Sequence, residues 1–148
     1  MGVADVWVAT LAAAFLSGFV PLVNIEAYLL GAAALLPGAP PLLVVVPAAL
    51  GQMAAKAVLF LGGRGLVALP LRVRDRALAA SARLGARRPP ALVFTSALTG
   101  LPPFYVVSVA AGMLGFRADH FLLAGLAGRL LRFGAVFALP GLLAWVIS

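Results

Sequence analysis

The sequence contains no cysteine, a single histidine and only four acidic residues among 148. The lack of cysteine excludes disulfide bonds and thiolate metal sites, and His120 alone cannot hold a metal ion. No serine lies at a position where this histidine would act as its base. The glycine-rich stretch GGRG at 62–65 lacks the lysine and hydroxyl residue of a nucleotide-binding loop. We therefore expect neither an enzyme nor a protein that binds a metal or cofactor.

Charge of either sign is scarce, because only 10% of the residues are charged and 64% are hydrophobic, with a mean hydropathy of +1.15. A soluble domain of this length needs a polar surface that this composition does not supply. Several apolar runs exceed the roughly 20 residues that a helix needs to cross a bilayer. We predict an all-α integral membrane protein with one membrane domain over 1–148, surrounded by membrane lipids and without a nucleic-acid partner.

Positive charge concentrates in residues 64–90, which hold seven arginines against one acid, Asp75. The positive-inside rule places this basic linker in the cytoplasm, and we expect the whole chain in the bacterial inner membrane. The linker is either an amphipathic helix whose arginines meet anionic lipid headgroups or a solvated basic loop. Because the first basic residue is Lys56, the start of the chain lacks the positive segment of a secretory signal.

The apolar remainder falls into two halves with the same order: a short apolar piece, a proline break, a second short piece, a turn and a long span. The pieces are 4–20, 25–36 and 42–63 in the first half and 91–100, 104–115 and 119–139 in the second. Gly31 matches Gly112 at an offset of 81, and Gly51 matches Gly128 at an offset of 77. We interpret residues 4–63 and 91–148 as two repeats.

The short pieces are too short to cross a membrane singly, because a 12-residue helix covers only about 18 Å of a hydrocarbon core of about 30 Å. We interpret each pair as a re-entrant helical hairpin, buried in protein or lining a wet cavity. Each repeat then crosses the membrane once, and the second is inverted relative to the first, as in many transporters. The alternative is that 4–36 and 91–115 each form one long kinked span, which gives four ordinary crossings.

Two arginines, Arg129 and Arg132, lie near the centre of the last predicted span and share one helical face. An arginine at that depth costs about 2.5–3.5 kcal/mol on insertion, so it normally has a function or a buried partner. Gln52 and Lys56 share a face of the span 42–63 in the same way. We predict that these four side chains bind the substrate, such as a lipid phosphate.

Glu26 is the only acid in the predicted membrane interior. It either forms a structural salt bridge with Arg129 or Arg132 or carries a coupling proton. The predicted hairpin tips supply six further candidates: Pro21, Asn24, Thr99, Pro102, Pro103 and Tyr105. Three glycines would let helices approach closely: Gly51, Gly125 and Gly128. Asp119 is expected to cap the last span at its N-terminus.

Three stretches of this sequence resemble the VTT, or SNARE-associated, domain of the DedA superfamily. The longest is LPPFYVVSVAAGMLGFRADHFLLAGLAGRLLRF, and the others are PLVNIEAYLLGAAALL and LGQMAAKAVLFLGGRGL. The resemblance covers roughly residues 15–140, and it is closest to the small branch of the superfamily. It implies an inverted-repeat fold with two opposed re-entrant hairpins.

The same resemblance implies a transporter that flips or scrambles a phosphate-headed lipid, such as a polyprenyl phosphate or a phospholipid, often with proton coupling. Glu26 would match the acid of the first hairpin, and Pro102 or Pro103 the proline of the second. Typical members carry an arginine before that proline, where this chain reads TGLPPF, so Arg129 and Arg132 would supply the positive charge. The alternatives are a proton-coupled exporter of small drug-like molecules and a non-transporting assembly protein. We also expect a homo-oligomer, at least a dimer.

Overall fold

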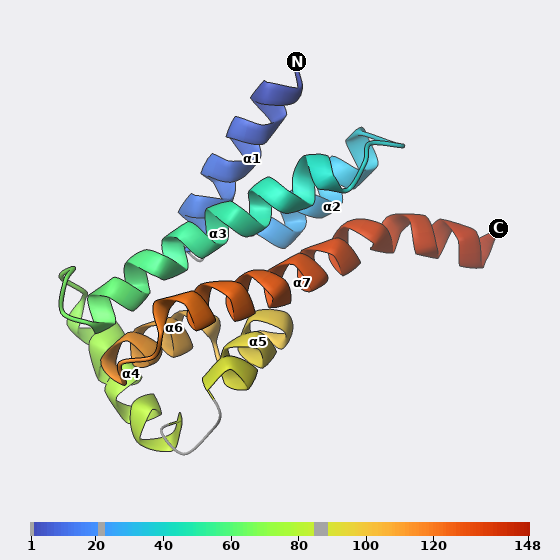
Figure 1. Ribbon diagram of the computed structural model, residues 1–148. Helices are drawn as coiled ribbons and strands as arrows, with labels where there is room; N and C mark the ends of the chain where they lie inside the picture. Colours follow the sequence, from blue (N-terminus) through green and yellow to red (C-terminus); the bar gives the residue numbers. More distant parts are fainter. Residues whose placement is uncertain (1, 21–22, 85–88) are drawn as a thin grey trace. The chain divides into compact units, whose positions relative to one another are not determined.

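A computed structural model describes residues 2–20, 23–84 and 89–148, and the regular elements in these ranges are all helices (Figure 1). They are α1 (Val3–Ser17), α2 (Ile25–Leu35), α3 (Leu42–Gly63), α4 (Leu71–Leu84), α5 (Pro89–Thr99), α6 (Phe104–Met113) and α7 (Ala118–Ile147). By length and composition α3 and α7 are able to cross a membrane. The predicted all-α class is therefore confirmed for the described part of the chain, whereas Pro21 of the first predicted hairpin tip lies outside it.

Helix α3 has the bounds that the sequence predicts, but α7 is longer than the expected span 119–139. It begins at Ala118 and continues through Pro140 to Ile147. A proline inside a helix removes one backbone hydrogen bond and bends the helix without necessarily ending it. Figure 1 shows such a bend in the last part of α7. Asp119 lies in the first turn of α7 rather than at its N-cap, and its Oδ1 accepts a hydrogen bond from the His120 N–H at 2.9 Å.

The basic linker contains α4, so the alternative of a loop is wrong for Leu71–Leu84. One face of α4 carries Ala77, which is fully buried, and Val73, which is half-buried. They pack against Leu59 of α3 and Val109 of α6. The helix therefore forms because this apolar face has a partner, while Arg72, Arg74 and Arg76 are exposed.

The chain divides into two compact units. The first unit comprises Met1–Gln52 and Leu130–Ser148, and the second unit comprises Met53–Arg129. Each unit therefore contains one pair of short helices, the beginning of the long helix that follows this pair, and the end of the other long helix. The second unit also contains α4.

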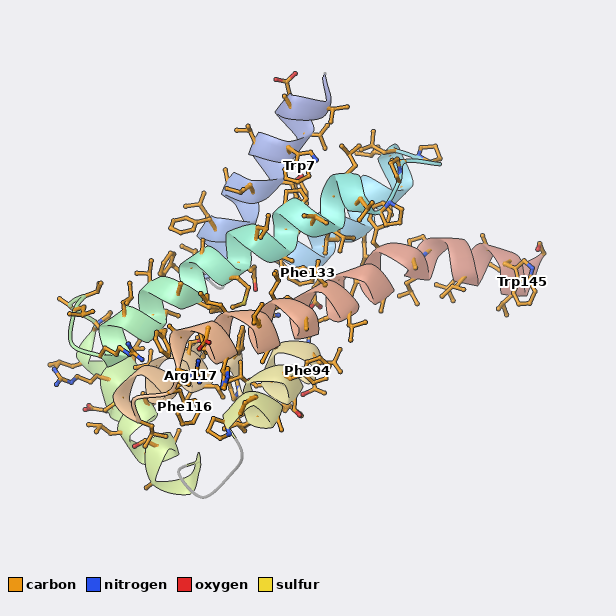
Figure 2. All side chains as sticks on the ribbon, viewed as in Figure 1. Trp7, Phe94, Phe116, Arg117, Phe133 and Trp145 are labelled. Atoms are coloured by element: carbon orange, nitrogen blue, oxygen red, sulfur yellow. The ribbon has the colours of Figure 1, made fainter. Side chains whose placement is uncertain are left out.

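In the first unit, α1 and α2 pack against each other, and the hydroxyls of Thr10 and Tyr28 share a hydrogen bond of 2.8 Å. Helix α3 approaches α1 at Gly51, where an added Cβ would lie 2.9 Å from the Ala14 Cβ and would clash with the Leu11 carbonyl oxygen. Glycine at this position thus permits contact between the two helix backbones. At the other end of the unit, Trp145 is 79% exposed on the last turns of α7 (Figure 2).

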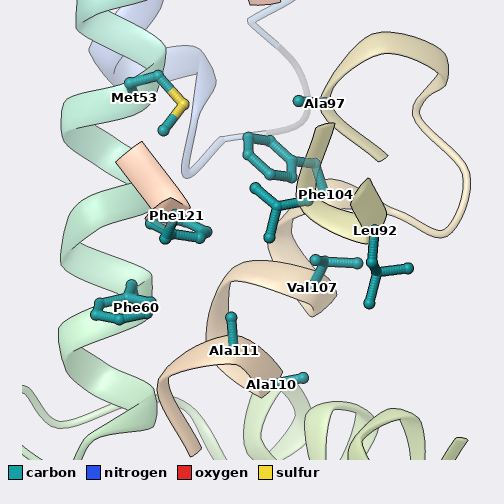
Figure 3. Packing of buried hydrophobic residues seen from close by; sticks show 10 residues of the cluster. Met53, Phe60, Leu92, Ala97, Phe104, Val107, Ala110, Ala111 and Phe121 are labelled. Atoms are coloured by element: carbon teal, nitrogen blue, oxygen red, sulfur yellow. The ribbon is translucent and has the colours of Figure 1, made fainter. Parts of the chain in front are cut away.

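The core of the second unit is a cluster of aromatic and aliphatic side chains from α3, α5, α6 and α7 (Figure 3). The Phe121 ring stacks on Phe60 with a centroid distance of 4.6 Å and on Phe104 at 6.1 Å. Helix α7 approaches α5 at Gly128, where an added Cβ would lie 2.7 Å from the Ala97 Cβ. The short helices α5 and α6 also pack against each other within this unit.

Gly51 and Gly128 meet equivalent atoms in the two units. In each case the three nearest atoms are a carbonyl oxygen, the Cβ of an alanine three residues later and the amide nitrogen of the next residue. They belong to Leu11, Ala14 and Phe15 for Gly51, and to Phe94, Ala97 and Leu98 for Gly128. Helices α3 and α7 therefore contact α1 and α5 through the same arrangement of backbone and alanine atoms.

Candidate functional site

Two buried basic side chains lie together in the second unit. Lys56 of α3 is 5% exposed and Arg129 of α7 is 8% exposed, and their positive charges act on each other. Burying one cation in an apolar interior is costly, and placing a second beside it adds repulsion. This pair is the largest concentration of buried charge among the described residues of the unit.

A close helix contact brings the pair together. At Gly125, one turn before Arg129, an added Cβ would lie 2.6 Å from the Cε of Met53. Met53 in turn lies about one helical turn before Lys56. The absence of a side chain at Gly125 therefore lets α7 approach α3, and the next turn of each helix carries the basic residue into the interior.

An aromatic ring covers one side of the Arg129 guanidinium. The Arg129 Cζ lies 4.8 Å from the centroid of the Phe104 ring, and Phe104 is the first residue of α6. An arginine stacked on a ring gains cation–π energy through its face, and its N–H groups remain directed outward along the edge. The Phe104 ring therefore covers one face of the guanidinium.

The acidic residues of the second unit are remote from its interior. They are Asp75 and Asp119, and both are exposed. Asp119 accepts a hydrogen bond from Arg117 at 2.8 Å on the surface. The acidic side chains of this unit therefore lie at its surface, whereas Lys56 and Arg129 are buried. Across the described ranges, no group of three or more His, Asp or Glu residues is arranged to hold a metal ion.

The first unit contains an ion pair of opposite charges instead. The Nε of Arg132 donates to the Oε1 of Glu26 at 2.5 Å, and the two side chains are 26% and 33% exposed. Glu26 lies in the first turn of α2, where the helix dipole favours a carboxylate. The Asn24 side chain caps the same turn and accepts the N–H of Glu26 at 2.9 Å. Asn24 therefore positions the carboxylate.

Gln52 binds to α1 rather than to a basic residue. Its Nε2 donates to the Ser17 hydroxyl at 2.7 Å, and that hydroxyl donates to the Ala14 carbonyl. Gln52 is 6% exposed, and its Oε1 accepts no hydrogen bond from the described residues. Its amide oxygen is thus an available acceptor in the first unit.

The predicted tip of the second hairpin is closed by its own hydrogen bonds. The Thr99 hydroxyl donates to the Thr95 carbonyl at 2.8 Å, and the Ser96 hydroxyl donates to the Pro102 carbonyl. Pro103 precedes α6 as its N-cap residue. The Tyr105 hydroxyl accepts a hydrogen bond from Arg76 of α4 at 2.8 Å. These residues have structural contacts in the second unit, and Tyr105 contacts the basic linker.

Within each unit the structure brings two of the predicted site residues together. It pairs Glu26 with Arg132 in the first unit and Lys56 with Arg129 in the second. The sequence analysis missed Phe104, and a phenylalanine directly after two prolines at the start of a helix was the available signal.

A cavity of about 500 Å³ lies elsewhere in the second unit. Phe116 and Arg117, labelled in Figure 2, line it together with residues at the beginnings of α5 and α7. The predicted site residues do not line this cavity. It is therefore distinct from the buried basic pair.

No family model, curated protein or solved structure matches this chain.

Proposed function

We propose that this protein is an integral membrane transporter of the DedA/VTT type that flips or scrambles a phosphate-headed lipid, such as a phospholipid or a polyprenyl phosphate. The observation that supports this proposal is the buried pair Lys56 and Arg129, carried by the two helices long and apolar enough to cross a membrane. In this proposal α3 and α7 span the bacterial inner membrane and the basic linker 64–90 lies in the cytoplasm.

The phosphate group is assigned to the second unit. Arginine binds phosphate through two parallel N–H donors, and lysine adds a mobile point charge. With the Phe104 ring against its face, Arg129 directs these donors along one edge. A phosphate there neutralises the mutual repulsion of Lys56 and Arg129, so the ligand lowers the cost of keeping both side chains buried.

Glu26 and Arg132 are assigned a separate role as a gate that responds to protons. In this role, a coupling proton carried by Glu26 removes the negative partner of Arg132. The pair then separates, and the beginning of α2 is released from α7. The transport rate would therefore depend on pH through Glu26, whereas binding of the phosphate would depend on Arg129.

Two structural observations support the inverted repeat that this function requires. The long helices contact α1 and α5 through equivalent atoms at Gly51 and Gly128. Each compact unit also combines one short helix pair with the beginning of one long helix and the end of the other. Exchanging the two repeats exchanges the composition of the two units, as an inverted duplication would. The pairs α1–α2 and α5–α6 are then the two re-entrant hairpins.

Native mass spectrometry of the purified full chain tests the phosphate site. We expect the wild-type protein to retain a phosphate-headed lipid and Arg129→Ala to lose it, with Arg129→Lys intermediate because it keeps the charge without the planar fork. Arg117→Ala is the matched control, because Arg117 is exposed and pairs with Asp119 on the surface. Equal lipid retention by wild type and a folded Arg129→Ala variant would refute the proposed site.

The Glu26–Arg132 pair also supports a second candidate function, proton-coupled export of small molecules. Transport that is lost in Glu26→Gln and unchanged in Arg129→Ala would favour this exporter. If every charge variant unfolds and no lipid or small molecule is moved, the charges hold the helices together in a non-transporting assembly protein.

A further inference from the structure

Helix α4 has two apolar faces, and only one of them packs against the protein. The inner face, with Ala77 and Val73, contacts the core of the second unit. Leu71 and Leu78 lie on the opposite side and are 76% and 50% exposed. Seven residues make nearly two helical turns, so these leucines are only about 20° apart around the helix axis. Leu71 and Leu78 thus form an outward apolar stripe, the leucine stripe.

Arg74 and Asp75 border the leucine stripe, one on each side. Arg72 lies beyond Asp75 around the helix, and all three side chains are exposed. The Nη1 of Arg76 donates to the Tyr105 hydroxyl of α6 at 2.8 Å, which holds this side chain where α4 meets the unit. Asp75 is the only acid on α4, so Arg72 and Arg74 give this outward surface a net positive charge.

This arrangement matches an interfacial helix. Leucines inserted among acyl chains remove apolar surface from water, and flanking arginines reach the headgroup phosphates with their long stems. A protein groove that binds a helix usually contacts apolar anchors at i, i+3, i+4 and i+7. Here the intermediate outward positions hold Arg74 and Asp75, and only the i and i+7 leucines remain. The chemistry therefore favours a lipid surface over a protein groove.

We propose that α4 binds flat on an anionic lipid bilayer surface, with the leucine stripe inserted and Arg72 and Arg74 on the headgroups. The inference rests on the proposed membrane location of the chain but not on transport. The second unit would thereby be fixed against one leaflet through a contact that depends on lipid charge and on ionic strength.

The absence of cysteine makes the test direct, since a single cysteine can carry a probe. We would place an environment-sensitive fluorophore on Leu78→Cys in the full chain and reconstitute it in two kinds of vesicles. One kind contains phosphatidylcholine alone, and the other also contains phosphatidylglycerol; both carry a lipid-attached quencher. We expect strong quenching and a blue shift only with phosphatidylglycerol, reversed by added salt.

A charge variant and its control sharpen the test. In the labelled protein, Arg74→Gln should weaken this lipid-dependent insertion about fivefold, as expected for one basic residue near an anionic surface. Arg117→Gln also removes a positive charge from the second unit but should leave insertion unchanged.

Two outcomes would overturn the inference. In the first, a probe at position 78 stays in water in both kinds of vesicles although the protein is incorporated. In the second, its signal follows protein density instead of lipid charge, which would assign the leucine stripe to a second copy of the chain. Failure of lipid transport with normal insertion would refute only the proposed function.

Discussion

Two arginines three residues apart on α7 have opposite electrostatic surroundings. Arg132, in the first unit, lies against the carboxylate of Glu26 and is partly open to water. Arg129, in the second unit, is buried beside another cation and against an aromatic ring. Arg132 has a carboxylate as its partner, whereas Arg129 and Lys56 act on each other as like charges. Position in an apolar helix therefore does not by itself predict the electrostatic surroundings of an arginine.

The largest expected difference between the two arginines concerns transport. Arg129→Ala should lower the rate of lipid translocation in vesicles about 10- to 100-fold, because it removes charged hydrogen bonds to the phosphate. Arg132→Ala should lower the rate less and should change its pH dependence. A fluorescent-phospholipid translocation assay measures both variants. Equal rates for the two variants at every pH would remove the functional distinction.

The next effect concerns stability in the first unit. Glu26→Gln should lower the free energy of unfolding by about 1–3 kcal/mol, because it leaves Arg132 partly buried without its carboxylate; the value for a fully buried pair is larger. Thermal unfolding in detergent measures the change. The double variant Glu26→Gln with Arg132→Gln should recover most of the loss. Strict additivity of the two substitutions would show that the pair contributes no coupling.

The corresponding substitution in the second unit should have the opposite sign. Lys56→Met removes one of two repelling cations and keeps the volume of the side chain, so the protein should be as stable as wild type or more stable by up to about 1 kcal/mol. The same unfolding measurement compares it with Glu26→Gln. A loss as large as that of Glu26→Gln would mean that Lys56 serves mainly to hold the structure together.

The smallest effect concerns the ring beside Arg129. Phe104→Leu should weaken lipid retention by about 1 kcal/mol through the lost cation–π contact, in addition to a cost in packing. Phe121→Leu is the matched control, because it removes a ring from the same cluster (Figure 3) and Phe121 stacks on Phe104. Native mass spectrometry should show weaker retention for Phe104→Leu than for Phe121→Leu, and identical retention would exclude a role for the ring.

The sequence predicted most of the helices because prolines and glycines mark their ends. Helix α3 begins after Pro41 and ends at Gly63, as predicted. The predicted span 119–139 is shorter than α7, because Pro140 lies inside the helix without ending it. For Glu26 the sequence left two arginines as partners, and the choice between them depends on how α2 and α7 pack. The contact of Phe104 with Arg129 depends on tertiary packing in the same way and leaves no periodic pattern.

The close helix contacts at Gly51 and Gly128 determine which amino acids each position accepts. Every other residue carries a Cβ, which would lie within 3 Å of backbone and alanine atoms, so neither position has a conservative replacement. Gly134 and Gly141 have no atom within 4 Å of an added Cβ. In a saturation mutagenesis scan these two should tolerate alanine, which favours a helix more than glycine does. Substitutions are therefore expected to be tolerated at Gly134 and Gly141 of α7 and rejected at Gly51 and Gly128.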